Sequence, residues 1–294
     1  MWNTEHLNQA RKYCTELAQT HYENFPVGRW VSPELKPYVH AIYAFVRIAD
    51  DFADEDCHHG QRLESLSQWR KALYEAEKGH AEHPVFIALA DTIQKFQIPV
   101  EWLDQLICAF EQDVVKNRHL NFESLLEYAR YSANPVGRLV LWLHGYRENQ
   151  LFEWSDSICS ALQFANFWQD VAIDWQKDRV YLPQDDMNRF GYLEEELKQG
   201  VVNENFCALL KFEIQRTWDL FWKGQALCDA VSGRLKIELR LIWLGGTRIL
   251  ERIEASNYDV FRRRPKLTFF DKGMMVWRTL DWDRRRLSVM QGTV

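Results

Sequence analysis

The sequence predicts an all-α protein, built as a single helical bundle. Glycine and proline, the residues that most often interrupt helices, number only 13 and 8 among 294 residues. Apolar residues recur with the helical period along most of the chain, and runs of β-branched residues are few. No Gly/Ser/Pro-rich linker, change of composition or internal repeat marks a boundary, so we expect residues 1–294 to form one domain.

The expected helices follow one another with short connections. Proline and glycine signals place the main loops at residues 25–37, 57–60, 98–99 and 183–191. The apolar periodicity predicts helices over residues 4–22, 35–56, 61–78, 83–96, 100–115, 122–147, 155–176, 194–198, 203–231 and 235–255.

The composition argues against several classes of protein. The longest apolar runs have five or six residues, whereas a membrane-spanning helix needs roughly 18 or more. The first residues lack the basic stretch and apolar stretch of a signal peptide, so we expect a cytoplasmic protein. The six cysteines form no CxxC pair, which argues against zinc and against a disulfide scaffold. The formal net charge of −6 argues against a general nucleic-acid binder.

Residues 262–286 carry the opposite charge to the rest of the chain. They hold nine Lys or Arg residues against three Asp residues. Two interpretations stay open for this segment. It is either a solvated basic tail or a surface that contacts phosphate groups, for example on the anionic inner face of a membrane as a peripheral attachment.

Residues 38–56 predict an amphipathic helix whose acidic residues border its apolar stripe. The apolar face carries Val39, Ile42, Tyr43 and Val46. Asp50, Asp51 and Asp54 follow at positions i, i+1 and i+4, and Arg47 lies one turn earlier. A solvated charged face is one interpretation. The other is a clamp for a hard cation, with Arg47 meeting the anionic ligand of that cation.

Residues 158–178 predict a second helix, apolar over most of its circumference, which we expect to be buried. The polar residues of this helix share one narrow stripe: Gln163, Asn166, Asp170, Asp174 and Lys177. Two buried, unpaired carboxylates would cost several kcal/mol each, so they need a cation, a salt bridge or a water-filled cavity. The alternatives are an ion-pair network with arginines and a set of Mg²⁺ ions bridged by a polyphosphate.

Two carboxylate clusters in an all-α protein suggest chemistry on a diphosphate. Mg²⁺ held by such clusters neutralises a diphosphate leaving group, so that an allylic or cyclopropylcarbinyl C–O bond ionises without a protein nucleophile. The resulting carbocation needs a dry apolar pocket. Aromatic residues make up 14% of the chain and could line that pocket, although an ordinary aromatic-rich core explains the same count.

Three segments resemble motifs of the squalene/phytoene synthase family. AIYAFVRIADDFADE at residues 41–55 resembles the first aspartate-rich motif, and LQFANFWQDVAIDWQKDRVYLP at 162–183 resembles the second. EYARYSANPVGRLVL at 127–141 resembles the kinked, tyrosine-bearing helix of that family. The segments occur in the family's order and spacing, and the resemblance spans residues 20–275. It implies an isoprenoid-synthase-type helical bundle around a central cavity.

The resemblance also implies roles for particular residues. The implied ligands of Mg²⁺ are Asp50, Asp51, Asp54, Asp170 and Asp174. The implied diphosphate-binding residues are Arg47, Arg179, Tyr181, Arg248 and Lys266. The implied catalytic residues are Tyr128, Tyr131, Gln163 and Asn166, and Gly137 matches the middle motif. For each tyrosine, core packing with a hydrogen-bonded hydroxyl group is at least as well supported as a catalytic role.

Two positions depart from the family's second motif. That motif usually has Arg immediately before its first Asp and an acid immediately before its second, where this chain has Gln169 and Ile173. The stretches YENFPVGRW at 22–30 and ANFWQDVAIDW at 165–175 resemble the bacterial hopanoid-pathway branch of the family. The resemblance therefore implies ionisation of presqualene diphosphate and capture of the cation by water.

Other functions compete with this interpretation. Within the family, the alternative is a head-to-head condensation of two farnesyl or geranylgeranyl diphosphates to presqualene diphosphate, squalene or phytoene. A non-catalytic helical scaffold is disfavoured because all five aspartates are present. The chain contains no GxGxxG motif, so reduction by NADPH is unsupported. The expected substrate makes a presqualene diphosphate synthase the functional partner.

Overall fold

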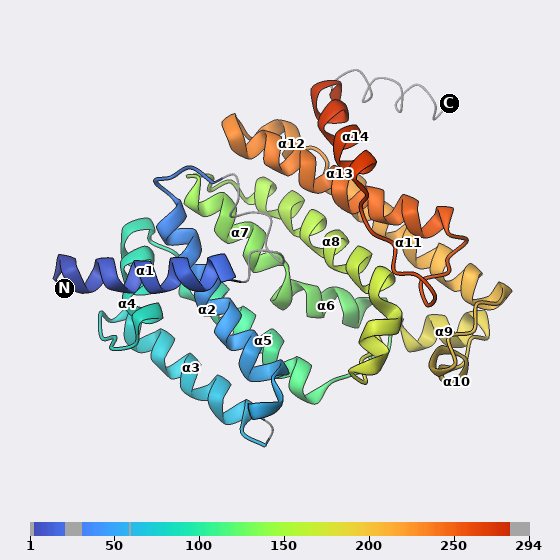
Figure 1. The fold of residues 1–294 in the computed structure, drawn as a ribbon, viewed down its shortest axis with the longest axis horizontal. Coiled ribbons are helices and arrows are strands. Elements are labelled where there is room, and N and C mark those ends of the chain that lie inside the picture. Colours follow the sequence, from blue (N-terminus) through green and yellow to red (C-terminus); the bar gives the residue numbers. More distant parts are fainter. Residues whose placement is uncertain (1–2, 21–30, 59, 283–294) are drawn as a thin grey trace. The chain divides into compact units, whose positions relative to one another are not determined.

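In the computed structural model, which describes residues 3–20, 31–58 and 60–282, the regular structure is α-helical (Figure 1). The helices are α1 (Thr4–Thr20), α2 (Lys36–Asp54), α3 (Arg62–Glu77), α4 (Pro84–Phe96), α5 (Val100–Val115), α6 (Phe122–Ser132), α7 (Asn134–Leu143), α8 (Asn149–Gln176), α9 (Gln184–Phe190), α10 (Glu194–Lys198), α11 (Glu204–Gly224), α12 (Leu227–Ala230), α13 (Gly233–Ala255) and α14 (Phe269–Leu280). A short 3₁₀ helix covers Asp56–His58. The all-α prediction is confirmed.

Two long helices expected from the periodicity are each divided in two. The helix expected over 122–147 ends at Ser132 and restarts at Asn134 as α7. Pro135 lies in the first turn of α7, where its missing N–H costs little, whereas inside one continuous helix it would remove a hydrogen bond. The helix expected over 203–231 likewise divides into α11 and α12.

Other differences concern segments taken as loops or as a tail. The loop expected at 183–191 contains α9, which ends at Gly191 in the left-handed conformation, φ 65°. Helix α8 begins at Asn149, earlier than the expected residue 155. Helix α14 lies within the basic segment 262–286, for which no helix was expected. Of the loop expected at 25–37, residues 25–30 lie outside the described residues, as do residues 22–30 of the hopanoid-branch resemblance.

The chain divides into two compact units. The first comprises residues 1–117 and 126–159, and the second comprises residues 118–125 and 160–294. The sequence of α8 therefore contributes to both. The expectation that the chain folds as a single domain stays a prediction. Within the described part of the chain, no helix has the length and apolar character needed to cross a bilayer.

Helix α2 lies at the centre of the first unit, where it packs against α1, α3, α4 and α5. Its residues Ala41, Ala44, Phe45 and Ala49 are completely buried. The three alanine side chains are small, which lets the neighbouring helices approach closely. Trp69 of α3 stacks on Phe45 and donates its indole N–H to the Phe45 carbonyl oxygen at 3.2 Å. These contacts fix the rotation of α2, and with it the direction of its acidic residues.

The second unit is held together by contacts among α8, α11 and α13. Trp168 of α8 is completely buried and donates its indole N–H to the Thr217 hydroxyl of α11 at 2.8 Å. A Cβ atom at Gly246 of α13 would lie 2.5 Å from Phe221 and 2.6 Å from Leu162. Glycine therefore lets α13 pack on both neighbours at a distance that a side chain would forbid.

Candidate active site

The first acidic motif lies on the C-terminal half of α2. Arg47 Nη1 lies 3.1 Å from Asp50 Oδ2, and Arg47 Nη2 lies 2.5 Å from Asp51 Oδ1. The structure thus brings Arg47 together with Asp50 and Asp51, as the spacing predicted. Asp54 is the last residue of α2, and its carbonyl oxygen accepts a hydrogen bond from Arg62 at 3.4 Å. The guanidinium group of Arg47 neutralises two carboxylates that would otherwise repel each other.

An apolar cavity of about 260 Å³ opens beside this motif, entirely within the first unit. Its lining residues are Val39, Ile42, Tyr43, Val46, Arg47, Asp50, Phe110, Val136, Leu139, Val140 and Leu143. Apart from Tyr43, Arg47 and Asp50, the lining is hydrocarbon. The prediction that the acids border an apolar surface is confirmed for Asp50, which lines the cavity. The apolar face of α2 does not pack entirely into the core, however. Its residues Ile42, Tyr43 and Val46 line this cavity and are only partly buried.

Tyr43 links the hydrocarbon lining to the charged end of the cavity. Burial raises the pKa of its hydroxyl group, Arg47 opposes that shift, and Asp50 and Asp51 add to it. The hydroxyl group therefore stays protonated at neutral pH. The arrangement can hold an anionic head group at Arg47 and an apolar chain in the cavity.

The middle motif occupies the break between α6 and α7 in the first unit. Tyr128 is buried and donates its hydroxyl hydrogen to Asp113 at 2.7 Å, whereas Tyr131 is half-buried. A Cβ atom at Gly137 would lie 2.3 Å from Ser155 Oγ and 2.5 Å from Cys159 Sγ. Glycine at this position therefore allows α7 to pack closely against α8. Asp113, the partner of Tyr128, was not singled out from the sequence.

The second acidic motif lies on α8 within the second unit. Asp170 is buried, and both of its carboxylate oxygens accept hydrogen bonds from Arg264, with Nη2 2.7 Å from Oδ2. The salt bridge considered for these acids is thus present for Asp170. Asp174 Oδ2 is buried and has no hydrogen-bond partner. Burial and the neighbouring Asp170 raise the pKa of Asp174 to about 7, against the opposing charges of Arg179, Lys177 and Arg264.

The polar stripe of α8 is less buried than expected. Asn166 is exposed, Gln163 is half-buried, and Ile173 is 42% exposed. The expectation that this helix is buried is therefore wrong at Asn166 and Ile173. The exposed positions lie where α8 approaches its final turns, and buried Trp168 and Phe164 hold its other face in the core of the second unit.

The segment after α8 positions Arg179 and Tyr181. Tyr181 stacks on Phe167 with ring centroids 3.6 Å apart and planes at 3°, and on His119 at 5.8 Å. The Arg179 backbone N–H donates to the Asp174 carbonyl oxygen at 2.9 Å. Arg179 therefore lies beside the second acidic motif, as a diphosphate-binding role requires, whereas Tyr181 is largely engaged in aromatic packing.

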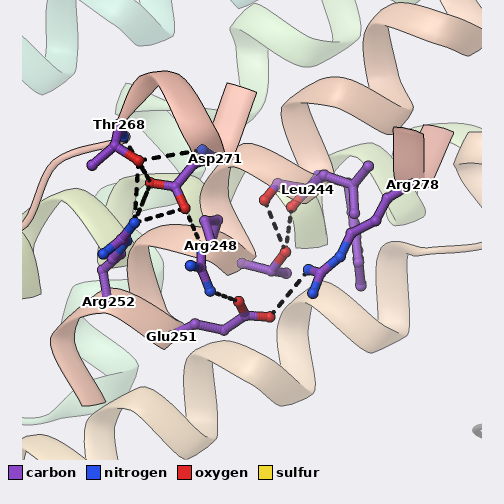
Figure 2. A network of polar contacts seen from close by, with 9 residues as sticks. Leu244, Arg248, Glu251, Arg252, Thr268, Asp271 and Arg278 are labelled. Atoms are coloured by element: carbon purple, nitrogen blue, oxygen red, sulfur yellow. Dashed lines mark hydrogen bonds and ion pairs between the residues drawn. The ribbon is translucent and has the colours of Figure 1, made fainter. Parts of the chain in front are cut away.

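Arg248 takes part in a network that joins α13 to α14 (Figure 2). Its Nε lies 2.6 Å from Asp271, and its Nη1 lies 2.5 Å from Glu251. Arg252 adds a second pair to Asp271 at 2.7 Å. Burial would raise the pKa of Asp271, but hydrogen bonds from Thr268, Arg248 and Arg252 lower it well below its usual range. Lys266, the other weakly indicated residue, is exposed.

The carboxylates fit Mg²⁺ chemically, although no complete ligand set is assembled. Within the described residues, no group of three or more His, Cys, Asp or Glu side chains is arranged to hold a metal ion. Carboxylate oxygens are nevertheless the ligands that Mg²⁺ prefers, usually together with substrate phosphate oxygens. The Oδ2 atom of Asp174 is buried and without a hydrogen-bond partner, so a cation beside it would stabilise the charged form of this carboxyl group. The donor chemistry therefore fits a magnesium ion that arrives with a diphosphate.

The fold, the aspartate-rich motifs and the apolar cavity define an all-α isoprenoid synthase. A family model described as squalene/phytoene synthase matches residues 4–271. The chain belongs to the squalene/phytoene synthase family, and it is an enzyme of that family.

Relatives within this family have several activities. A hydroxysqualene synthase of Rhodopseudomonas palustris is 33% identical over 241 residues, covering 80% of each chain. A phytoene synthase of Arthrospira platensis is 28% identical over 281 residues, covering 91% of each. The crystal structure of squalene synthase HpnC from Alicyclobacillus acidocaldarius has a TM-score of 0.82 and 36% identity, covering 86% of this chain and 95% of that one. A dehydrosqualene synthase structure, 21% identical with a TM-score of 0.83, covers 96% of this chain and 99% of its own and supports the fold alone.

Proposed function

We propose that this enzyme ionises presqualene diphosphate and captures the cation with water, releasing hydroxysqualene and diphosphate. The observation that carries the proposal is the Arg47–Asp50–Asp51 cluster at the charged end of an apolar cavity. An isoprenoid diphosphate has the same division between a charged head and a hydrocarbon chain. Farnesyl and geranylgeranyl diphosphates, the substrates of the alternative reaction, share that division. The two reactions are therefore distinguished by their products.

The residues of the two acidic motifs take complementary roles in this proposal. Asp50, Asp51, Asp54, Asp170 and Asp174 would hold Mg²⁺, which when bound neutralises the charge of the leaving diphosphate. Arg47 and Arg179 bind diphosphate oxygens, and both lie beside carboxylates of their own motif. The hydrocarbon lining of the cavity excludes water from the chain that it holds.

Capture by water assigns a role to the neutral polar residues of α8. Gln163 and Asn166 share the helix face of Asp170 and Asp174, and their amides can hold one water near the carbocation. The water oxygen bonds to the carbon, one proton leaves, and an alcohol results. In the overall reaction, presqualene diphosphate and water give hydroxysqualene and diphosphate, with no reductant. Tyr128 and Tyr131 are proposed to orient the substrate.

The comparisons support this activity and a second candidate. The Rhodopseudomonas palustris relative is a hydroxysqualene synthase. The relative from Arthrospira platensis, matched over 91% of this chain, is a phytoene synthase. The second candidate is therefore the head-to-head condensation of two farnesyl or geranylgeranyl diphosphates. The departures at Gln169 and Ile173 favour the first candidate, because they alter the charges of the second motif.

Isotope labelling separates the two candidates. The purified enzyme is incubated with Mg²⁺ and presqualene diphosphate in H₂¹⁸O, and the extracted lipid is analysed by mass spectrometry. We expect an alcohol that contains one ¹⁸O atom, at a rate independent of NADPH. As the control, unlabelled alcohol incubated with enzyme in H₂¹⁸O stays unlabelled. Squalene formed only with NADPH, or consumption of farnesyl diphosphate but not presqualene diphosphate, would assign the second candidate instead.

The proposal extends to attachment at a membrane surface, since substrate and product are lipids. Phe269 and Phe270, at the start of α14, are 90% and 88% exposed. Arg262, Arg263, Lys266 and Lys272 are exposed nearby in the sequence. Exposed aromatic side chains among basic ones suit an anionic bilayer surface. Reversible attachment there would give access to presqualene diphosphate made by a partner synthase.

A further inference from the structure

Asp170 is paired with an arginine that the motif does not contain. Arg264 belongs to the connection between α13 and α14, 94 residues further along the chain. Its guanidinium group donates to both oxygens of Asp170, and its charge also acts on Asp174 one turn away. The Asp170 side chain is 10% exposed and the Arg264 side chain 36%. Arg264 thus pairs with the buried Asp170, while its own side chain stays partly exposed to solvent.

Gln169 holds the segment that carries this arginine. The Gln169 side-chain amide donates a hydrogen bond to the carbonyl oxygen of Pro265, the residue next to Arg264. Gln169 and Pro265 are both buried. The proline has no N–H of its own and a restricted backbone, so fixing its carbonyl oxygen fixes the start of the Arg264 side chain. Gln169, which departs from the family's motif, therefore holds the segment between α13 and α14 in place.

The two contacts oppose the binding of a cation at Asp170. A guanidinium group that uses both carboxylate oxygens occupies the positions a metal ion would take, and two cations at one carboxylate repel each other. Asp174 Oδ2, without a hydrogen-bond partner, stays available. A metal ion therefore meets no competing hydrogen-bond donor at Asp174 Oδ2, whereas at Asp170 it competes with Arg264 for both carboxylate oxygens.

We propose that Gln169 and Arg264 form a latch on the second acidic motif, in which Arg264 holds Asp170 until a metal ion displaces it. Gln169 is a positioning residue that acts through Pro265. The latch keeps the buried acid neutralised in the empty enzyme, and its opening couples metal loading to movement of residues 261–267. The inference rests on the proposed metal-binding role of Asp170 and Asp174.

Metal affinity in the absence of substrate tests the latch. Mn²⁺ binding to the full chain is titrated by electron paramagnetic resonance, with and without inorganic diphosphate. Arg264→Gln should bind Mn²⁺ roughly tenfold more tightly than the wild type. The metal ion then no longer has to break a hydrogen-bonded pair of charged groups, and the free energy of such a pair corresponds to about this factor in affinity. Gln169→Met should tighten binding by a smaller factor. The matched control is Arg262→Gln, because that side chain is 87% exposed and pairs with Asp259, three residues earlier. Its Mn²⁺ affinity should equal that of the wild type.

Hydrogen exchange supplies a second readout. Mn²⁺ with diphosphate should increase deuterium uptake over residues 261–267 in the wild type, whereas Gln169→Met should show high uptake before metal is added. Should Arg264→Gln fail to fold, as judged by circular dichroism, Gln169→Met carries the test alone. Equal Mn²⁺ affinity in the wild type and in the folded latch variants overturns the latch.

The measurement also separates failure of the latch from failure of the proposed function. Mn²⁺ binding that is lost in Asp174→Asn, together with unchanged affinity in Arg264→Gln, rejects the latch alone. A wild-type protein that binds no Mn²⁺ even with diphosphate rejects the metal assignment, and the latch with it.

Discussion

Asp54 and Asp174 represent the two acidic motifs at the scale of single residues. The first ends α2, and the second has a buried oxygen with no hydrogen-bond partner. Substitution by asparagine keeps the shape of each side chain and removes its charge. We expect Asp54→Asn and Asp174→Asn each to lower turnover by at least about a hundredfold, because the charge of a leaving diphosphate then goes partly unneutralised.

Turnover in both variants is measured with excess Mg²⁺, and folding is checked by circular dichroism. Glu77→Gln serves as the control, since it removes one exposed carboxylate at the end of α3. Full activity in EDTA, or in either aspartate variant, would show that the metal assignment is wrong.

At the scale of helices, a buried acidic pair joins α9 to α11. Glu213 is completely buried, and Asp186 is 4% exposed. Arg216 lies 2.6 Å from Asp186 and 3.3 Å from Glu213, with its guanidinium group 4.0 Å from the Phe212 ring centre. Burial raises the pKa of Glu213 to about 8, with Arg216 opposing the shift and Asp186 adding to it. The protonated, neutral form of Glu213 is therefore favoured in the folded protein at pH 7.

This raised pKa predicts how stability depends on pH. The unfolded chain releases the Glu213 proton near pH 4.3, whereas the folded protein keeps it until about pH 8. The free energy of unfolding should therefore fall as pH rises between these values, by up to roughly 1 kcal/mol per pH unit from this residue. The free energy of unfolding of Glu213→Gln should differ less from that of the wild type at pH 5 than at pH 8. At pH 8 the variant should be the more stable of the two.

Urea unfolding at pH 5 and pH 8, followed by circular dichroism, measures this difference. Glu204→Gln, which changes an exposed residue of the same helix, should leave the pH dependence unchanged. A fall in stability from pH 5 to pH 8 that is identical in the wild type and in Glu213→Gln would contradict the assignment.

At the scale of the whole molecule, the prediction concerns membrane attachment. Helix α14 is anchored to α13 by Arg248 and Arg252 through Asp271 (Figure 2). This anchor holds the exposed Phe269 and Phe270 on a stable helix. Vesicles of anionic lipid should carry the wild type upward in flotation at low salt, and high salt should weaken the binding by screening.

The double variant Phe269→Ser with Phe270→Ser should lose most of this flotation, because it keeps the charge but removes the inserting surface. Leu193→Ser provides the control, since that side chain is 62% exposed on another helix connection. If the wild type fails to float with anionic lipid at low salt, the proposed membrane attachment is wrong.

Local pattern was sufficient for most of the helices and for the positions of the acidic motifs along them. The period of the apolar residues predicted α5 and α10 at their observed bounds, because a helix is built from contacts three and four residues apart. The same rule placed Arg47 within reach of Asp50 and Asp51. The break at Pro135 and the helix at 184–190 were missed, because the first needs the geometry of a helix start and the second lies between loop signals.

Contacts between distant residues depended on the tertiary structure. No spacing in the sequence links Arg264 to Asp170, Gln169 to Pro265 or Tyr128 to Asp113. The basic segment 262–286 left a solvated tail and a phosphate-contacting surface open as interpretations. One of its arginines, Arg264, instead pairs with the buried Asp170. The resemblance made Arg248 a candidate diphosphate-binding residue. In the structure, the packing of α14 places Asp271 beside Arg248, and the two form an ion pair. The sequence determines which residues can carry charge or bury surface, but chain folding decides which of them meet, because those contacts depend on packing between helices far apart along the chain.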